Sequence, residues 1–243
     1  MTTRPVLTAA LIATASILFL AGCAAGPAPT GTPTASPTAT GTATGSPAAT
    51  GCAPNSEAMP SGAMSAEIGD IDGDGKPDTE WYAETPSFAY GVTTASGATF
   101  VIPDTMAGPG RHSGWTATGL ENDQVLTVVD DGRGAQLYAF VKCAFVTPMG
   151  ADGKAYTFDM ENLRGNGTGV WCTGGELDGV QALLATDGTY TITVTPILVS
   201  ADGKTATNGE TSQLSAVPAD DPRVADAQRS TCGETPIVST SGM

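Results

Sequence analysis

The sequence has little basic charge, few aromatic residues and one histidine. Its 243 residues hold 10 Lys+Arg against 25 Asp+Glu, a formal net charge of −15, and 6% are aromatic. An acidic chain is repelled by phosphate backbones and by anionic headgroups alike. The composition therefore argues against nucleic acid as a partner, and every histidine-dependent mechanism would have to use His112.

Only one long apolar run occurs, and it lies at the N-terminus. Residues 5–20 (PVLTAALIATASILFL) follow Arg4 and end at the small residues of Leu20-Ala21-Gly22-Cys23. The run is shorter than the roughly 20 residues that a spanning helix needs. A basic start, an apolar core and a small-residue end are typical of a signal peptide, so we expect residues 1–22 to be removed.

The four residues Leu20 to Cys23 resemble the lipobox of bacterial lipoproteins. This resemblance implies that the Cys23 thiol is diacylglycerated, that Cys23 becomes the first mature residue, and that its amine is acylated, with fatty acids such as palmitate. Each buried CH2 contributes about 0.8 kcal/mol, so two or three chains anchor a protein stably. We expect a lipid anchor on the extracytoplasmic face of the cell membrane; the alternative is an ordinary secreted protein.

Residues 24–51 lack charge, aromatic rings and any side chain larger than proline or threonine. Such a segment cannot bury enough apolar surface to offset chain entropy. We expect residues 23–51 to form a disordered Thr/Pro/Ala/Gly-rich linker behind the lipidated cysteine. The exported β-domain then spans residues 52–235, with a flexible tail at 236–243. The mature chain carries nine basic and 25 acidic residues, a net charge of −16, because Arg4 leaves with the signal peptide.

The remaining cysteines are Cys52, Cys143, Cys172 and Cys232, and none belongs to a CxxC pair. With a single histidine in the chain, this spacing excludes a zinc site. An even number of cysteines in an exported domain indicates two disulfides, although four cysteines allow three pairings. We expect Cys52–Cys232, which would join the ends of the domain, and Cys143–Cys172 between neighbouring segments.

Helical periodicity is scarce in the domain, and short alternating or apolar runs are common. These runs predict strands at residues 125–129, 136–141, 181–184 and 189–194. Turn dipeptides separate the runs, at Asp131-Gly132, Asp152-Gly153, Asp187-Gly188, Asp202-Gly203 and Asn208-Gly209.

One short C-terminal helix is expected at residues 221–229. Asp221 can cap it, and Pro222 would occupy its first helical position. The sequence thus predicts an antiparallel, all-β domain with this single helix.

A weak internal repeat relates residues 70–83, 130–141 and 173–185. Each segment is an Asp/Gly-rich turn that opens directly into an apolar strand. Repeats of this kind indicate repeated sheet units, as in propeller blades, but three copies are too few for a propeller of four to eight blades. We expect a partial or degenerate β-propeller-like repeat fold, with a β-sandwich as the alternative.

The first copy, "DIDGDGKPDTEWYA", carries a dense set of oxygen ligands. Ca2+ takes six to eight oxygens at about 2.3 to 2.6 Å, and alternate aspartates of a tight loop can all turn inward. The candidate metal ligands are Asp70, Asp72, Asp74, the carbonyl of Lys76, and Asp78. An EF-hand would require Glu at loop position 12, where this chain has Trp81, so the EF-hand proper is excluded.

The pattern Asp70-x-Asp72-Gly73-Asp74-Gly75-x-x-Asp78 followed by a strand resembles FG-GAP/VCBS-type repeats of secreted and surface proteins. The segments LRGNGTGVWC (163–172) and PRVADAQRSTCG (222–233) are similar to parts of small exported actinobacterial lipoproteins. The resemblance implies a loop-to-strand calcium site with a structural rather than catalytic role.

Candidates for catalysis or recognition are scattered. His112 lies beside Ser113 in a glycine-rich loop, where we expect a solvated side chain. No spacing singles out a carboxylate pair among Glu67, Glu80, Glu84, Glu161 and Glu176, and nothing distinguishes a binding face from core packing at Trp81, Tyr82, Trp115, Tyr138 and Trp171.

We therefore expect a binding or scaffold module in the cell envelope, calcium-stabilised, with an envelope protein or glycan as its partner and no catalytic residues. An envelope hydrolase with an unrecognised active site is the alternative, and a structural spacer is a third reading. The sequence does not indicate an oligomeric state.

Overall fold

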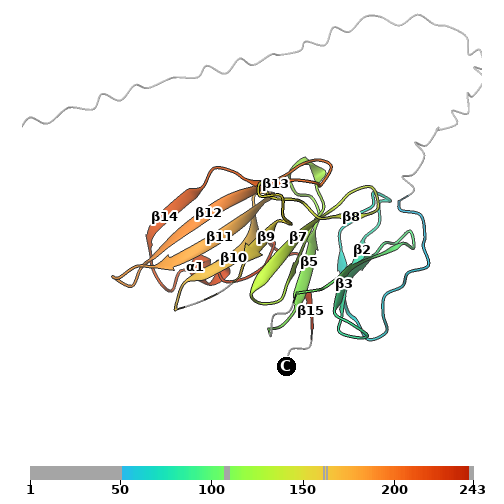
Figure 1. Ribbon diagram of the computed structural model, residues 1–243, viewed down its shortest axis with the longest axis horizontal. Coiled ribbons are helices and arrows are strands. Elements are labelled where there is room, and N and C mark those ends of the chain that lie inside the picture. The colour runs from blue at the N-terminus through green and yellow to red at the C-terminus, as the bar shows by residue number, and fades with distance from the viewer. Residues whose placement is uncertain (1–50, 107–109, 161, 163, 241–243) are drawn as a thin grey trace, which may run out of the picture. The chain divides into compact units, whose positions relative to one another are not determined.

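The computed structural model describes residues 51–106, 110–160, 162 and 164–240, which belong by their contacts to one compact unit (Figure 1). Strands account for 45% of the described residues and helix for 4%. The described strands form three antiparallel sheets, none of them closed. The prediction of a mostly β, antiparallel fold with one short helix is confirmed.

The N-terminal sheet has the order β1-β2-β3-β4. Its core strand β2 aligns Trp81 with Gly91 of β3, and a Cβ at Gly91 would lie 2.2 Å from the indole ring. Glycine is required there because the tryptophan occupies the space of a side chain. The strands are β1 (Met64–Ile68), β2 (Asp78–Ala83), β3 (Ala89–Thr93) and β4 (Thr99–Pro103).

The central sheet has the order β15-β5-β6-β7-β8, and β9 also pairs with β7. The strands predicted at 125–129 and 136–141 correspond to β6 and β7. Its members are β5 (Ser113–Ala117), β6 (Leu126–Asp130), β7 (Gly134–Phe140), β8 (Phe145–Val146), β9 (Thr157–Asp159) and β15 (Val238–Ser239). A short 3-10 turn, η1 (Glu121–Asp123), precedes β6.

The C-terminal sheet has the order β10-β11-β12-β13, with β14 also paired to β12. The strands predicted at 181–184 and 189–194 are parts of the longer β11 and β12. Figure 1 shows this sheet with α1 beside it. Its strands are β10 (Gly167–Thr173), β11 (Glu176–Leu184), β12 (Tyr190–Val199), β13 (Ala206–Asn208) and β14 (Ser212–Val217).

The central sheet is buried on both faces, because its alternating side chains enter two different cores. Val128 and Leu137 pack with Val170 of the C-terminal sheet. Val129 of the central sheet packs with Tyr90 of the N-terminal sheet. Since successive side chains of a strand point to opposite faces, this division follows directly from the sequence of β6 and β7. Because both faces are buried, the sequences of β6 and β7 are mostly apolar rather than alternating between apolar and polar residues.

The expected disulfide pairing is wrong, although all four cysteines form disulfides. Cys52 is bonded to Cys143, and Cys172 to Cys232. The C-terminal segment runs alongside β10, with a parallel bridge from Val170 to Ser230, and this brings Cys232 to Cys172. The start of the domain is thus fastened to the turn between β7 and β8, and its C-terminal segment to β10, rather than the two ends to one another.

The C-terminal region differs from expectation in two further ways. The helix α1 spans Pro222–Asp226, shorter than predicted, and Asp221 caps it by accepting a hydrogen bond from the Arg223 amide. The expected flexible tail at 236–243 is also corrected: β15 pairs Val238 with Gly114 and Ser239 with Ser113 of β5. Residues 241–243 of that prediction lie outside the described part, as do the signal peptide and residues 23–50.

The three copies of the weak repeat fall in three different sheets. The turns at 69–77, 131–133 and 174–175 lead into β2, β7 and β11, respectively. Among the described residues, no helix has the length and apolar character needed to cross a membrane.

Candidate functional site

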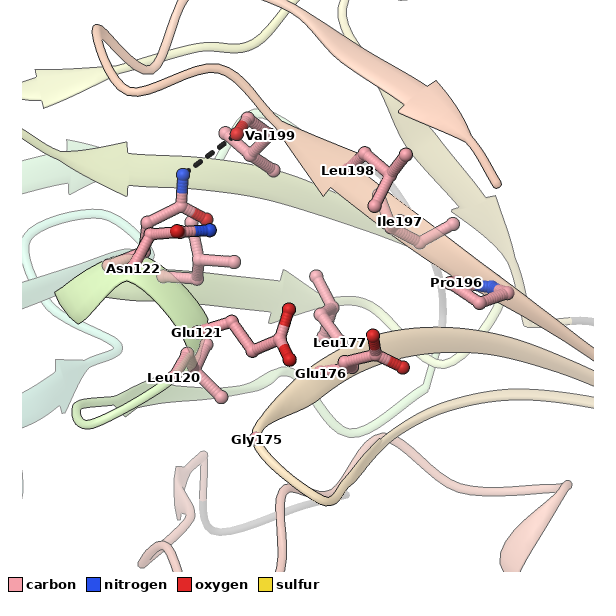
Figure 2. A pocket seen from close by; sticks show the side chains of 12 residues that line it. Leu120, Glu121, Asn122, Gly175, Glu176, Leu177, Pro196, Ile197, Leu198 and Val199 are labelled. Carbon is pink, nitrogen blue, oxygen red and sulfur yellow. Dashed lines mark hydrogen bonds between the residues drawn. The ribbon is translucent and has the colours of Figure 1, made fainter. Parts of the chain in front are cut away.

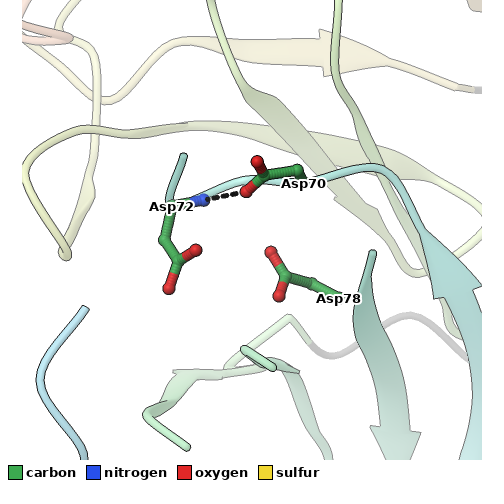
Figure 3. A group of neighbouring side chains, drawn as sticks. All are labelled: Asp70, Asp72 and Asp78. Carbon is green, nitrogen blue, oxygen red and sulfur yellow. Dashed lines mark hydrogen bonds between the residues drawn. The ribbon is translucent and has the colours of Figure 1, made fainter. Parts of the chain in front are cut away.

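The Asp loop, residues 70–78, connects β1 to the first residue of β2. Ligand oxygens of Asp70, Asp72 and Asp78 all lie within 4.8 Å of one another, and Figure 3 shows the three carboxylates facing a common space. Asp78 is buried and the other two are partly buried. Three of the four predicted aspartates are therefore brought together.

Asp70 organises the turn through backbone amides. Its Oδ1 accepts hydrogen bonds from the amides of Asp72 at 3.2 Å, Gly73 at 2.7 Å and Asp74 at 3.2 Å, and its Oδ2 accepts one from Gly75 at 2.7 Å. Gly73 and Gly75 have positive φ angles of 77° and 83°, which only glycine adopts without strain. Each carboxylate oxygen offers about two acceptor positions, and Oδ2 uses one of them, so it keeps capacity for a cation.

Asp72 ties the loop to the start of the described chain. Its Oδ2 lies 2.8 Å from the Cys52 amide and 2.7 Å from the Ser96 hydroxyl, and both donate to it. A Cβ on Gly51, whose φ is 58°, would lie 2.7 Å from the same oxygen. Burial acts to raise the pKa of Asp72, but the bonds from Cys52 and Ser96 outweigh it, so that the pKa is lowered.

Asp78 ties the loop to the turn between β3 and β4. Its Oδ2 accepts from the Ile71 amide and its Oδ1 from the Ala95 amide, each at 2.7 Å. Burial is the main cause that raises the pKa of Asp78, and the charges of Asp72 and Asp70 add to it. A divalent cation among these groups would reverse that charge effect.

Asp74 and Lys76, also predicted as ligands, lie outside the three-carboxylate group. Asp74 Oδ1 accepts from the Lys76 amide at 2.8 Å, and its Oδ2 is 3.9 Å from Lys76 Nζ. The arrangement supplies hard oxygen ligands from the loop and backbone amides around them. Oxygen-rich geometry of this kind suits Ca2+ rather than a thiophilic metal.

His112 is buried, which corrects the expectation of a solvated loop side chain. It is 4% exposed, its Nδ1 lies 2.6 Å from Asp104 Oδ2, and Phe88 stacks on it with ring centroids 4.6 Å apart. The Tyr82 hydroxyl donates to the same Asp104 oxygen. The contact between His112 and Asp104 joins the end of β4 to the start of β5. Arg111 and Ser113, the neighbours of His112 in sequence, line a cavity whose described lining does not include His112.

Ser113 pairs with a carboxylate rather than forming the start of a Ser–His unit. Its hydroxyl donates to Asp130 Oδ2 at 2.7 Å, and Asp130 Oδ1 accepts from the Gly132 amide at 3.0 Å. Burial is the main cause that raises the pKa of Asp130.

Glu80 is a buried carboxyl that the sequence did not single out. It is 0% exposed; its Oε2 accepts from the Tyr90 hydroxyl at 2.6 Å and from the Thr116 amide at 2.8 Å, while Oε1 has no hydrogen-bond partner. Burial raises the pKa of Glu80 to about 8. Its position between Asp78 and Tyr82 on one face of β2 was the available signal, since alternate residues of a strand share a face.

The other predicted candidates do not gather into a site. Glu67, Glu84 and Glu176 are exposed on separate elements, and Glu161 lies outside the described residues. The aromatic candidates are core groups: Trp81, Tyr82 and Trp115 are fully buried, and Tyr138 and Trp171 are partly buried.

Two cavities differ in size and character. The smaller, about 130 Å3, lies among η1, the start of β11 and the β12 residues Pro196 to Val199, with Glu121 and Glu176 beside it (Figure 2). The larger is about 540 Å3 and is lined by residues from five separate parts of the chain, including Arg111 and Arg229. Only the larger falls in the usual range of small-molecule sites, roughly 300 to 1,000 Å3.

A comparison of the chain with protein-family models, with curated proteins and with solved structures finds no match.

Proposed function

We propose that this protein is a lipid-anchored cell-surface lipoprotein whose calcium-stabilised β-domain acts as a binding module in the cell envelope. The observation that carries the proposal is the group of three carboxylates at Asp70, Asp72 and Asp78, within 4.8 Å of one another. Like charges at this separation repel, and a Ca2+ ion would offset that repulsion while joining the loop to its neighbours.

The role proposed for the ion is structural. Its ligands also hold Cys52 and Ala95, so that ion binding would stiffen the junction between the linker and the N-terminal sheet. The described surroundings of the group are backbone amides and the Ser96 hydroxyl. This supports a clamp rather than a reaction centre.

We also propose that the domain is built from three divergent FG-GAP/VCBS-like repeats. One Asp/Gly-rich turn enters each of the three sheets, which agrees with three divergent FG-GAP/VCBS-like units forming a partial propeller-like array. In this interpretation only the first unit retains its ion site.

Calcium titration of the purified chain tests the ion. Ligand binding to the folded state alone stabilises it by about 2.7 kcal/mol at 100 times the dissociation constant, and about 1 kcal/mol moves the melting temperature of a domain this size by roughly 2 to 4 °C. We expect calcium to raise the melting midpoint by about 5 to 10 °C over EDTA, and Asp72→Asn to abolish the rise.

Asp152→Asn is the matched control, because Asp152 lies in an exposed turn and accepts a hydrogen bond from the Lys154 amide, two residues away. That variant should keep the full calcium response. Equal melting temperatures of the wild type in calcium and in EDTA would refute the ion.

The lipid anchor is tested separately by mass and partitioning. The mass of the membrane-extracted protein should show that it begins at Cys23 and carries added acyl groups. In detergent phase partitioning, Cys23→Ala should move the protein from the detergent phase into the aqueous phase. A Cys23→Ala form that remains equally membrane-bound would contradict the anchor.

A further inference from the structure

A polar cavity lies where the central sheet meets the segment that follows α1. Its volume is about 540 Å3. Its walls come from the start of β5, the end of β6, the residues Met160 and Asn162, residues 228–231 and the β15 segment. We call it the arginine cavity, and its charged lining residues are Arg111, Arg229 and Asp130.

Arg111 is oriented by neutral groups. Its Nε donates to the Thr240 carbonyl at 3.3 Å, and a terminal nitrogen donates to the Ser239 hydroxyl. Neither acceptor neutralises the guanidinium. A guanidinium has five N–H donors in a planar fork, so Arg111 keeps donors for a ligand.

Arg229 belongs to a wall that is fastened at several points. Its carbonyl accepts from the Val170 amide at 2.9 Å, and the Thr231 amide donates back to Val170 at 2.9 Å. The Trp115 indole donates to the Ser230 hydroxyl at 2.8 Å, and the Cys172–Cys232 disulfide follows directly. A pre-organised wall lowers the ordering cost of binding.

The two arginines form no ion pair with the described carboxylates, although the protein is strongly acidic. Within the described part of the chain, no carboxylate lies within 4.0 Å of either guanidinium. Among the described lining residues Asp130 is the one acid, and its oxygens already accept hydrogen bonds from Ser113 and Gly132. Even with Asp130 ionised, the lining residues that the structure describes keep a net positive charge.

The uncharged lining is suited to a hydroxylated molecule. Hydroxyls and amides supply most of it, with Met160 and Ile237 as apolar contacts. These polar residues are Ser113, Asn162, Gln228, Ser230, Thr231 and Ser239.

We propose that the arginine cavity binds an acidic sugar, whose carboxylate or phosphate is held by Arg111 and Arg229 and whose hydroxyls meet the Ser, Thr, Asn and Gln lining. Arginine forks match planar oxyanions through paired, charge-assisted hydrogen bonds. The inference rests on the proposed binding function and names its ligand class, while using residues far from the Asp loop in sequence.

The test is equilibrium binding to the full chain in calcium-containing buffer, followed by NMR of the labelled protein. The probes are glucuronate, glucose 6-phosphate and glucose. Either or both acidic sugars should bind at least about tenfold more tightly than glucose, and the comparison of the two distinguishes a carboxylate from a phosphate source.

Arg229→Gln is the primary variant, because the Arg229 side chain is exposed and its substitution leaves the backbone bonds to Val170 in place. It should weaken binding of the acidic sugar about tenfold and leave the glucose result unchanged. Arg133→Gln is the matched control: it removes the same charge from an exposed turn residue outside the lining, and should change binding less than twofold.

Equal affinity for glucose and for both acidic sugars overturns the proposal, and so does an Arg229→Gln effect no larger than that of Arg133→Gln. These outcomes are separable from those of the Asp loop. If the calcium response persists while acidic sugars fail to bind, only the proposal that the cavity binds an acidic sugar is rejected. If Arg229-dependent binding persists without a calcium response, the proposed calcium site is rejected and the proposed sugar site is retained.

Discussion

The Asp loop and the arginine cavity are opposite in charge and in construction. The loop gathers three carboxylates from nine consecutive residues, Asp70 to Asp78. The cavity gathers its two arginines from positions 111 and 229, which are 118 positions apart and flank a stretch of sequence that includes most of two sheets. Local chain geometry is enough to build the first, whereas the second exists only once the sheets have packed.

The two regions nevertheless share a device, since a disulfide fastens each of them. Cys52, whose amide bonds to Asp72, is linked to Cys143 over 91 residues. Cys232, which follows the cavity wall, is linked to Cys172 over 60 residues. Removing one disulfide at a time therefore separates the regions experimentally.

The largest expected effect comes from those disulfides. Loop-closure entropy predicts that Cys52→Ser/Cys143→Ser and Cys172→Ser/Cys232→Ser each lower the free energy of unfolding by about 4 to 5 kcal/mol. We expect the first double variant to weaken calcium stabilisation and spare sugar binding, and the second to do the reverse. Denaturant melts and the two titrations measure this; loss of both responses in either variant would show that the regions are not independent.

A smaller effect distinguishes two acids on one strand. Asp78 has both oxygens bonded to amides, whereas Glu80, two residues on, leaves Oε1 unpartnered and has its pKa raised from 4.5 to about 8. Between those values the folded state binds more protons than the unfolded state. The free energy of unfolding should therefore fall as the pH rises from about 4.5 to about 8, and then level off.

Glu80→Gln should remove this component, which is on the order of a few kcal/mol at 1.4 kcal/mol per pKa unit. Chemical denaturation across that pH range is the measurement. Glu67→Gln, an exposed residue on the neighbouring β1, is the control and should retain the wild-type slope. An unchanged slope in Glu80→Gln would mean that Glu80 is ionised throughout.

The smallest expected effect concerns Asp130, the acid among the described residues of the arginine cavity. Asp130→Asn removes a negative charge while keeping an oxygen that can accept from Ser113. Acidic-sugar affinity should rise about threefold, equivalent to about 0.7 kcal/mol, and the calcium response should not change. Weaker binding would indicate that Asp130 contacts the ligand directly.

Part of the fold followed from local patterns. The strands at 125–129 and 136–141, the Asp–Gly turns and the Asp221 cap depend on periodicity and turn chemistry, which act over a few residues. The disulfide pairing and the role of residues 238–239 did not follow, because both depend on the C-terminal segment returning to β10 and β5. Proximity in sequence and position at a chain end were poor guides to either.

The same distinction holds for the sites. Asp70, Asp72 and Asp78 were identifiable because their spacing alone predicts convergence. The prediction for His112 was wrong because its glycine-rich flanks indicated a solvated loop, whereas Asp104, just after β4, and Phe88, just before β3, enclose it. Nothing in the sequence marks Arg229, which becomes notable only because it lines the same cavity as Arg111.

The bond between Cys52 and Cys143 also sets how the domain responds to force. Tension applied through Gly51 enters a covalent link to the turn between β7 and β8, in the sheet that is buried on both faces. It therefore bypasses β1, an edge strand whose pairing with β2 would otherwise open one residue at a time. When force is applied from this end, the domain should resist as one unit rather than lose its strands one after another from the β1 edge.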